Sequence, residues 1–185
     1  MDERTPSELE DIDLMLRASK DDLDAFSALV RKHEQALMNF FARNGVFRDV
    51  EDLAQQTFLK LYRARATYRP SAKFTTYLYL LARQVLIDSV RASERHSALH
   101  ERAGQEMPVS EEPPATRGET GDAETALASL SPELREAVVL VVMQGFPYAD
   151  AAEILGVPVG TVKSRIHAAL EKMRKVLNLR PRPQD

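Results

Sequence analysis

Residues 148–170 read YADAAEILGVPVGTVKSRIHAAL, and they contain the clearest pattern in the chain. A short helical segment is followed by the turn Gly156-Val157-Pro158 and by a second helical segment that begins near Val159. Glycine can adopt the left-handed conformation that ends a helix, and proline fits at a helix start because the first N–H groups need no intrahelical partner. The pattern predicts a helix-turn-helix, with helices over residues 148–155 and about 159–177.

The second of these helices has two chemically different faces. The expected inward stripe consists of Val162, Ile166, Ala169, Met173 and Leu177. Lys163, Ser164 and His167 fall together on another face near the amino end, where a recognition helix meets base edges. Thr161, Arg165 and the first backbone N–H groups suit phosphate contacts. The alternative is an ordinary helical hairpin with a charged face, and the pattern favours DNA binding over it.

Residues 97–121 interrupt the helical patterns with prolines and glycines, and residues 96–125 contain seven acidic and two basic side chains. Such a segment buries too little apolar surface to offset its loss of entropy on ordering. We therefore expect a flexible acidic linker over residues 97–121, between domains over residues 1–96 and 122–185. No strand alternation occurs elsewhere, so the predicted fold is all-α, with two small helical domains.

The first domain is expected to contain a short acidic helix around Ile12 and three longer helices. Apolar residues recur at helical spacing from Phe26 to Phe41, although His33 interrupts their stripe. Asp49 is an expected N-cap of the next helix. The last helix, expected from Phe74 to about Arg91, is apolar on most sides and should be central.

In the second domain, two further helices are expected before the helix-turn-helix. The first covers about residues 123–130, and Ser131-Pro132-Glu133 is a strong start signal for the second. Gly145 should end that second helix. That helix carries the apolar residues Leu134, Val138, Val141 and Val142.

Charge is distributed in blocks, although the net charge is only −3. Residues 60–95 contain eight basic and two acidic side chains, and residues 160–182 contain seven and one. The first block also contains aromatics, a mixture that suits a single strand held by base stacking and by phosphate contacts from Lys73, Arg83 and Arg91. Burial in the core is the favoured explanation for Phe74, Leu78 and Tyr79. Tyr68 and Arg69, beside Pro70, are expected to be exposed loop contacts.

Composition argues against several other classes of protein. The chain has no cysteine, and no apolar run approaches the roughly 18 residues of a membrane span. The acidic N-terminus has no apolar signal core, so cytoplasmic location is expected. His96 and His100 have i, i+4 spacing but no clear third ligand, so no metal site is expected. No phosphate-binding loop or nucleophile motif occurs. We expect no catalytic residues, no cofactor and no small-molecule substrate.

Several segments, in order, resemble the extracytoplasmic-function (ECF) type of bacterial RNA polymerase sigma factor. Residues 24–41 are similar to the opening of sigma region two, and residues 49–58 (DVEDLAQQTF) to its core-polymerase-binding helix. Residues 74–91 resemble the promoter-melting segment. Residues 126–177 resemble sigma region four, and residues 160–165 (GTVKSR) are the most specific run. Tyr77 and Gln84 stand where the family often has tryptophan and asparagine.

The resemblance implies a division of roles. One helix face would bind core polymerase; its residues are Asp49, Glu51, Asp52, Gln55 and Gln56. Region two would bind the minus-ten element as a melted single strand through Tyr68, Arg69, Lys73, Tyr77, Arg83, Gln84 and Arg91. Region four would recognise the duplex minus-thirty-five element through Thr161, Lys163, Ser164, Arg165 and His167. The linker would thread the polymerase's RNA path, and a separate anti-sigma factor is a candidate partner.

Two other functions stay open at this point. A stand-alone helix-turn-helix regulator would bind duplex DNA without polymerase, but it leaves the residue 49–58 face unexplained. A pure interaction protein that titrates an anti-sigma factor would bind that partner without directing transcription.

Overall fold

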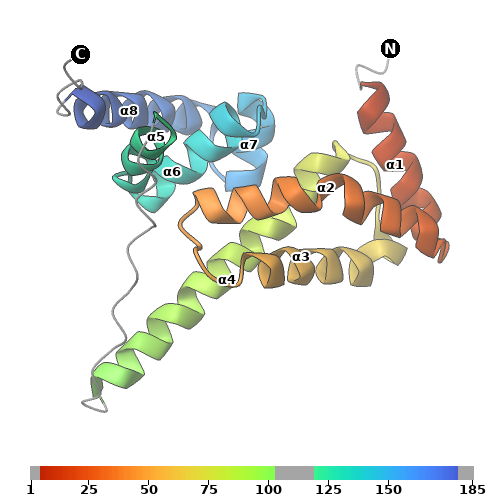
Figure 1. Cartoon of the computed structure of the whole chain (residues 1–185). Coiled ribbons are helices and arrows are strands. Elements are labelled where there is room, and N and C mark those ends of the chain that lie inside the picture. The colour runs from red at the N-terminus through yellow and green to blue at the C-terminus, as the bar shows by residue number, and fades with distance from the viewer. Residues whose placement is uncertain (1–4, 103–118, 179–185) are drawn as a thin grey trace.

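The computed structural model describes residues 5–102 and 119–178, and every regular element in these ranges is helical (Figure 1). The first range contains α1 (Pro6–Ala18), α2 (Leu23–Arg43), α3 (Val50–Ala64), the 3-10 turn η1 (Arg65–Thr67) and α4 (Phe74–Arg102). The second contains α5 (Glu119–Ala128), α6 (Pro132–Val138), the π-helical turn η2 (Val139–Met143), α7 (Tyr148–Leu155) and α8 (Val159–Asn178). The all-α prediction is confirmed.

Helix α4 ends at Arg102, eleven residues beyond its expected end at about Arg91. The interval expected as a linker, residues 97–121, therefore begins within α4 and ends within α5. Its central part, residues 103–118, lies outside the described residues. The division into two domains stays a prediction, and the contacts between the two described ranges are given below.

Helix α1 begins with a reciprocal capping box. The Thr5 hydroxyl accepts a hydrogen bond from the Glu8 N–H at 3.3 Å, and the Glu8 carboxylate accepts one from the Thr5 N–H at 2.7 Å. Met15 is then buried where α1 packs against α2.

His33, in the otherwise apolar stripe of α2, pairs with a buried aspartate of α1, Asp11. This aspartate is almost fully buried; its carboxylate lies 2.7 Å from Lys32 Nζ and 3.1 Å from His33 Nε2. Burial acts to raise the pKa of Asp11, but the hydrogen bonds from His33 and Lys32 outweigh it, so the pKa lies below its ordinary value. His33 is thus a structural partner of α1.

The core of the first described range lies between α2, α3 and α4 and combines aliphatic and aromatic side chains. Phe40 contacts Phe41 and Tyr79 with ring centroids 5.4 and 5.3 Å apart, and Phe74 and Leu78 are fully buried. Burial of each such side chain stabilises the fold by about 1.5–3 kcal/mol. The prediction that Phe74, Leu78 and Tyr79 are core residues is confirmed.

Helix α3 begins where expected, and Asp49 occupies the N-cap position, but its side chain does not act as a cap. Asp49 has φ +60° and its side chain makes no capping hydrogen bond. An N-cap residue whose side chain bonds to the first-turn N–H groups typically has an extended backbone, and Asp49 is left-handed instead. Glu51 and Asp52 still occupy the first turn, where carboxylates favour the positive end of the helix.

Helix α6 begins at Pro132 as predicted. Of the four apolar residues named for this segment, Val142 is 56% exposed. The reason is η2: the Gln144 N–H bonds to the Val139 carbonyl, five residues back, at 2.9 Å. This wider turn shifts the fully buried positions to Val139 and Leu140.

The helix-turn-helix agrees with the sequence. Gly156 is left-handed at φ +65° and ends α7, and α8 follows from Val159. Val162, Ile166 and Ala169 are buried as expected. The expected inward position of Leu177 is wrong, because this residue is 41% exposed in the last turn of α8, beyond the other helices.

The two described ranges pack against each other, and α7 contacts α4. Buried residues of both ranges form one continuous apolar cluster. The carboxyl-terminal part of α4 projects away from this body, and residues 91–96 are all exposed.

Candidate nucleic-acid and polymerase interfaces

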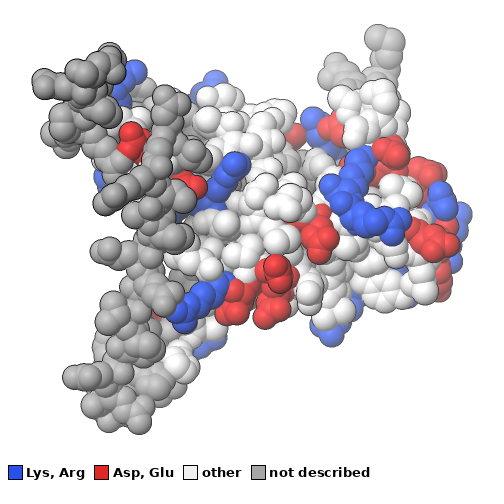
Figure 2. Space-filling model, in the orientation of Figure 1, with Lys and Arg blue, Asp and Glu red and all other residues white. Residues whose placement is uncertain are grey.

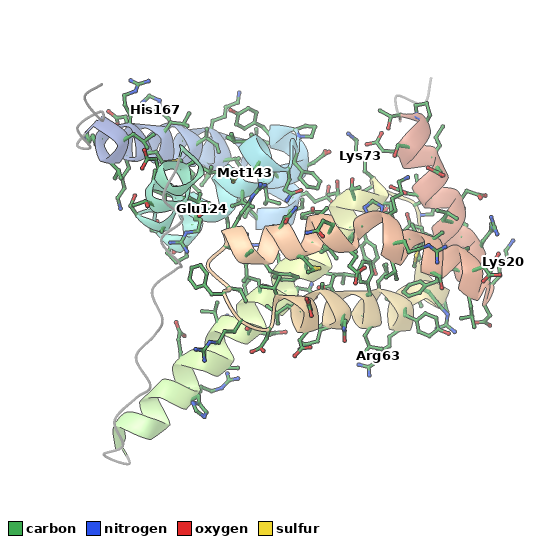
Figure 3. The ribbon with its side chains drawn as sticks, in the orientation of Figure 1. Lys20, Arg63, Lys73, Glu124, Met143 and His167 are labelled. Carbon is green, nitrogen blue, oxygen red and sulfur yellow. The ribbon has the colours of Figure 1, made fainter. Side chains whose placement is uncertain are left out.

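The amino-terminal half of α8 presents a polar face opposite its buried stripe. Lys163, Ser164 and His167 are all exposed. Figure 3 shows His167 on the side of α8 that faces away from α2 and α4. The Ser164 hydroxyl donates a hydrogen bond to the Thr161 carbonyl at 3.0 Å. The three side chains therefore form one accessible surface on a rigid helix.

Arg165 and Thr161 lie at the margin of this surface, because both are half-buried. Arg165 lies close enough to Glu133, at the start of α6, to help lower the pKa of that carboxyl; the hydrogen bonds that Glu133 accepts are the larger cause. The structure thus brings together Lys163, Ser164 and His167, with Arg165 turned towards α6.

Helix α3 presents the second predicted surface. Its predicted members Asp49, Glu51, Asp52, Gln55 and Gln56 are all exposed, while Leu53, Ala54, Thr57 and Phe58 are buried. Sequence reasoning missed Leu59, which is 46% exposed on the same helix. Its spacing of four residues from Gln55 places it on the same face, and this spacing was a signal that could have found it. The surface is therefore acidic and amide-rich with an apolar residue.

The loop after η1 and the exposed side of α4 contain the third predicted set. Arg69, Gln84 and Arg91 are exposed, and Tyr77 is half-buried. The expected exposure of Tyr68 is wrong, because only 6% of it is accessible. Its ring packs against Phe74 and Tyr77, with centroids 6.4 and 5.6 Å away. Tyr68 supports the loop, and Arg69 extends from it.

Two cations of the same set contact carboxylates of the second described range. Lys73 Nζ lies 3.3 Å from Asp150 of α7 and 3.1 Å from Glu8 of α1, and Figure 3 shows it between these helices. The hydrogen bond to Glu8 is the main cause that raises the pKa of Lys73. Arg83 Nε lies 3.2 Å from Glu136 of α6. Lys73 and Arg83 therefore differ from the exposed members of the set.

Two other kinds of feature are absent from the described residues. None of them form a group of three or more histidine or acidic side chains that could hold a metal ion. Over residues 5–102 and 119–178, no helix is both long and apolar enough to cross a bilayer. Figure 2 shows acidic and basic side chains interspersed over the end of the molecule where α1 and α2 lie, so no patch of one sign forms there on that face.

Comparison with known proteins accounts for both parts of the chain. Residues 29–96 match the family described as Sigma-70 region 2, and residues 121–173 match Sigma-70, region 4. The chain is 33% identical over 161 residues to RNA polymerase sigma factor CarQ of Myxococcus xanthus, covering 83% of this chain and 90% of CarQ. It is 31% identical over 182 residues to the ECF RNA polymerase sigma-E factor of Escherichia coli, covering 89% and 92%.

A solved structure has the same architecture. The sigma factor RpoE from Bartonella quintana, in complex with the anti-sigma factor NepR, superposes with a TM-score of 0.69 at 26% identity. The match covers 84% of this chain and 98% of that one.

The helix-turn-helix and these matches define a sigma-70-type transcription factor. The chain belongs to the ECF family of RNA polymerase sigma factors. Proteins of this family bind RNA polymerase and direct transcription from promoters; they are DNA-binding regulatory proteins, not enzymes.

Proposed function

We propose that this sigma factor uses three separate surfaces during promoter recognition. The exposed face of α8 recognises the minus-thirty-five element as duplex DNA, with Lys163, Ser164 and His167 at base edges and Thr161 and Arg165 near phosphates. The single observation that carries this proposal is the α8 geometry: three accessible polar side chains stand near the amino end of a helix whose opposite stripe is buried. That is the geometry of a recognition helix.

The minus-ten element is bound as an opened single strand by the loop around residues 68–73 and by α4. Arg69 and Arg91 are exposed and suit phosphates, and Gln84 suits a base edge. One extruded base would lie beside the loop. Unpairing it costs a few kcal/mol, which these contacts must offset. Tyr77 is half-buried and can supply the edge of a stacking surface.

Core polymerase binds the α3 surface, now extended by Leu59. An exposed apolar side chain among acidic and amide groups is typical of a specific protein interface, because the polar groups give orientation and the apolar group gives affinity. The chain would act in the cytoplasm, with polymerase and the promoter. An anti-sigma factor is a candidate further partner, supported by the RpoE–NepR complex.

Run-off transcription tests the proposal. Core polymerase from a bacterium that encodes a close relative is incubated with a sequenced promoter library, with and without the chain. We expect new start sites that share two upstream elements at fixed spacing. Specific duplex binding by the full chain without any new start sites, with a cognate core enzyme, would instead support the stand-alone regulator.

A further inference from the structure

The contact between α4 and the second described range is built around one aromatic pair. The Tyr79 and Phe146 rings meet edge to face with centroids 4.8 Å apart. Tyr79 is 3% exposed and its hydroxyl donates to the Gln144 side chain at 2.9 Å. Gln144 in turn donates to the Ala36 carbonyl of α2 at 3.4 Å. This set of contacts joins α2 and α4 to the segment between η2 and α7.

Two ion pairs flank the aromatic contact, and in both the first described range supplies the cation and the second supplies the carboxylate. Lys73, just before α4, contacts Asp150, and Arg83 of α4 contacts Glu136. Burial raises the pKa of Glu136, and Arg83 acts against that rise. A lysine or arginine group that contacts a carboxylate has fewer donors left for a phosphate.

The interface is mixed in character. Tyr79 and Phe146 belong to the apolar cluster that the two ranges share, and charged and amide groups flank them. A cavity of ≈ 380 Å³ beside the aromatic pair is lined by Lys73, Asp150, Tyr79 and Phe146. Interfaces between domains of one chain generally resemble transient contacts, so relative motion is expected. Lys73 also contacts Glu8 of α1, at 3.1 Å.

We propose that region four is an intramolecular competitor of single-stranded promoter DNA. In this closed arrangement Asp150 and Glu136 occupy the places of DNA phosphates on Lys73 and Arg83, and α7 covers part of the α4 surface. The minus-ten strand gains these cations only when region four moves away. This inference rests on the proposed minus-ten function, and it adds that the chain restrains its own DNA binding without any partner.

The test exploits the absence of cysteine from the chain. Spin labels at Ser27→Cys and Ala128→Cys, both exposed and on opposite sides of the interface, report the distance between the two parts by pulsed electron resonance. The variant E136Q/D150N removes both carboxylates. The matched control E153Q/E171Q removes two exposed carboxylates of α7 and α8 and changes the net charge equally.

We expect a distance distribution dominated by one narrow peak for the parent chain and the control, and a broad distribution without that peak for E136Q/D150N. A random single-stranded 12-mer should bind E136Q/D150N about fivefold more tightly than the parent, as expected if the open form is about a fifth of the parent population. The control should stay within about twofold of the parent. Adding the 12-mer to the labelled parent should broaden its distribution.

A broad distribution in the parent, equal gains in variant and control, or DNA binding that leaves the distance unchanged would each overturn the inference. If circular dichroism shows that E136Q/D150N does not fold, Gln144→Ala removes the hydrogen bonds to Tyr79 and Ala36 and is tested in the same way. The distance measurement is independent of transcription. Failure of the run-off assay with a responsive distance would therefore reject the sigma role, while leaving the closed contact intact.

Discussion

Helices α8 and α4 both contribute cations that we assign to DNA, but these cations differ in what they contact. Lys163 of α8 is exposed on the outer side of the molecule, whereas Arg83 of α4 contacts Glu136 and Lys73, just before α4, contacts Asp150. Cationic side chains are therefore exposed to solvent on α8 but paired with carboxylates at α4. The basic blocks in the sequence identify both surfaces equally well, but they do not show which cations are paired.

The largest effect is expected from Lys163→Ala. If Lys163 recognises a base, duplex affinity should fall by about 1–3 kcal/mol and the preference at that position should relax. Quantitative binding to a library of duplex sites measures both. Lys172→Ala, an exposed lysine further along α8, is the control and should leave the preference unchanged. An unaltered preference in Lys163→Ala would remove this residue from base recognition.

Variants of the α3 surface test whether DNA binding by α8 is independent of polymerase binding. The double variant E51K/Q55A should weaken core-polymerase affinity by about 2 kcal/mol, because it reverses a charge and removes a hydrogen-bonding group at an interface. Titration with labelled polymerase measures this, and duplex binding by α8 should not change. Wild-type polymerase affinity in a folded variant would contradict the assignment of α3.

Arg69→Ala tests an exposed cation of the predicted minus-ten set, in contrast to Lys73 and Arg83, which contact carboxylates. Its loss should reduce single-strand affinity by about 1 kcal/mol and lower the salt-dependence slope by about 0.7, as for one lost phosphate contact. Anisotropy titrations at several salt concentrations measure both quantities. Arg63→Ala, an exposed arginine of α3 outside the predicted set, should change neither. Equal slopes in all three proteins would exclude a phosphate contact at Arg69.

The smallest expected effect is that of Glu136→Gln on the pH dependence of the unfolding free energy. Its pKa is raised by burial, so the folded chain binds more protons at this site than the unfolded chain does. By linkage, this group makes stability fall as pH rises above the ordinary glutamate value of 4.5 through the raised folded pKa. In Glu136→Gln that component is absent, so the difference in unfolding free energy between variant and parent should shift in favour of the variant as pH rises. A pH-independent difference, measured by urea unfolding, would contradict the burial argument.

Sequence signals were sufficient where structure depends on neighbouring residues. The bounds of α7 and the start of α8 follow from Gly156 and Pro158, since both act through their own backbone conformation. The exposed face of α3 follows from helical periodicity in the same way. Lys163, Ser164 and His167 were placed correctly because a buried stripe fixes the opposite face of a helix.

The sequence was insufficient where distant contacts decide. The π-helical turn moves Val142 outwards, and helical periodicity assumes that no such turn occurs. Tyr68 is buried by Phe74 and Tyr77, which lie beyond the proline that suggested an exposed loop. The pairing of Arg83 with Glu136 joins residues 53 positions apart, and no local pattern indicates it.

The projecting end of α4 affects how far apart the two described ranges can lie while the chain connects them. From Val90 to Arg102, α4 extends for roughly 18 Å at 1.5 Å per residue. Residues 103–118 can then span at most roughly 60 Å between the two described ranges. The number of residues between the two described ranges thus sets an upper limit on their separation without unwinding a helix, and it keeps their effective concentration above that of separate molecules. A contact too weak to form between separate molecules can therefore be well populated within this one.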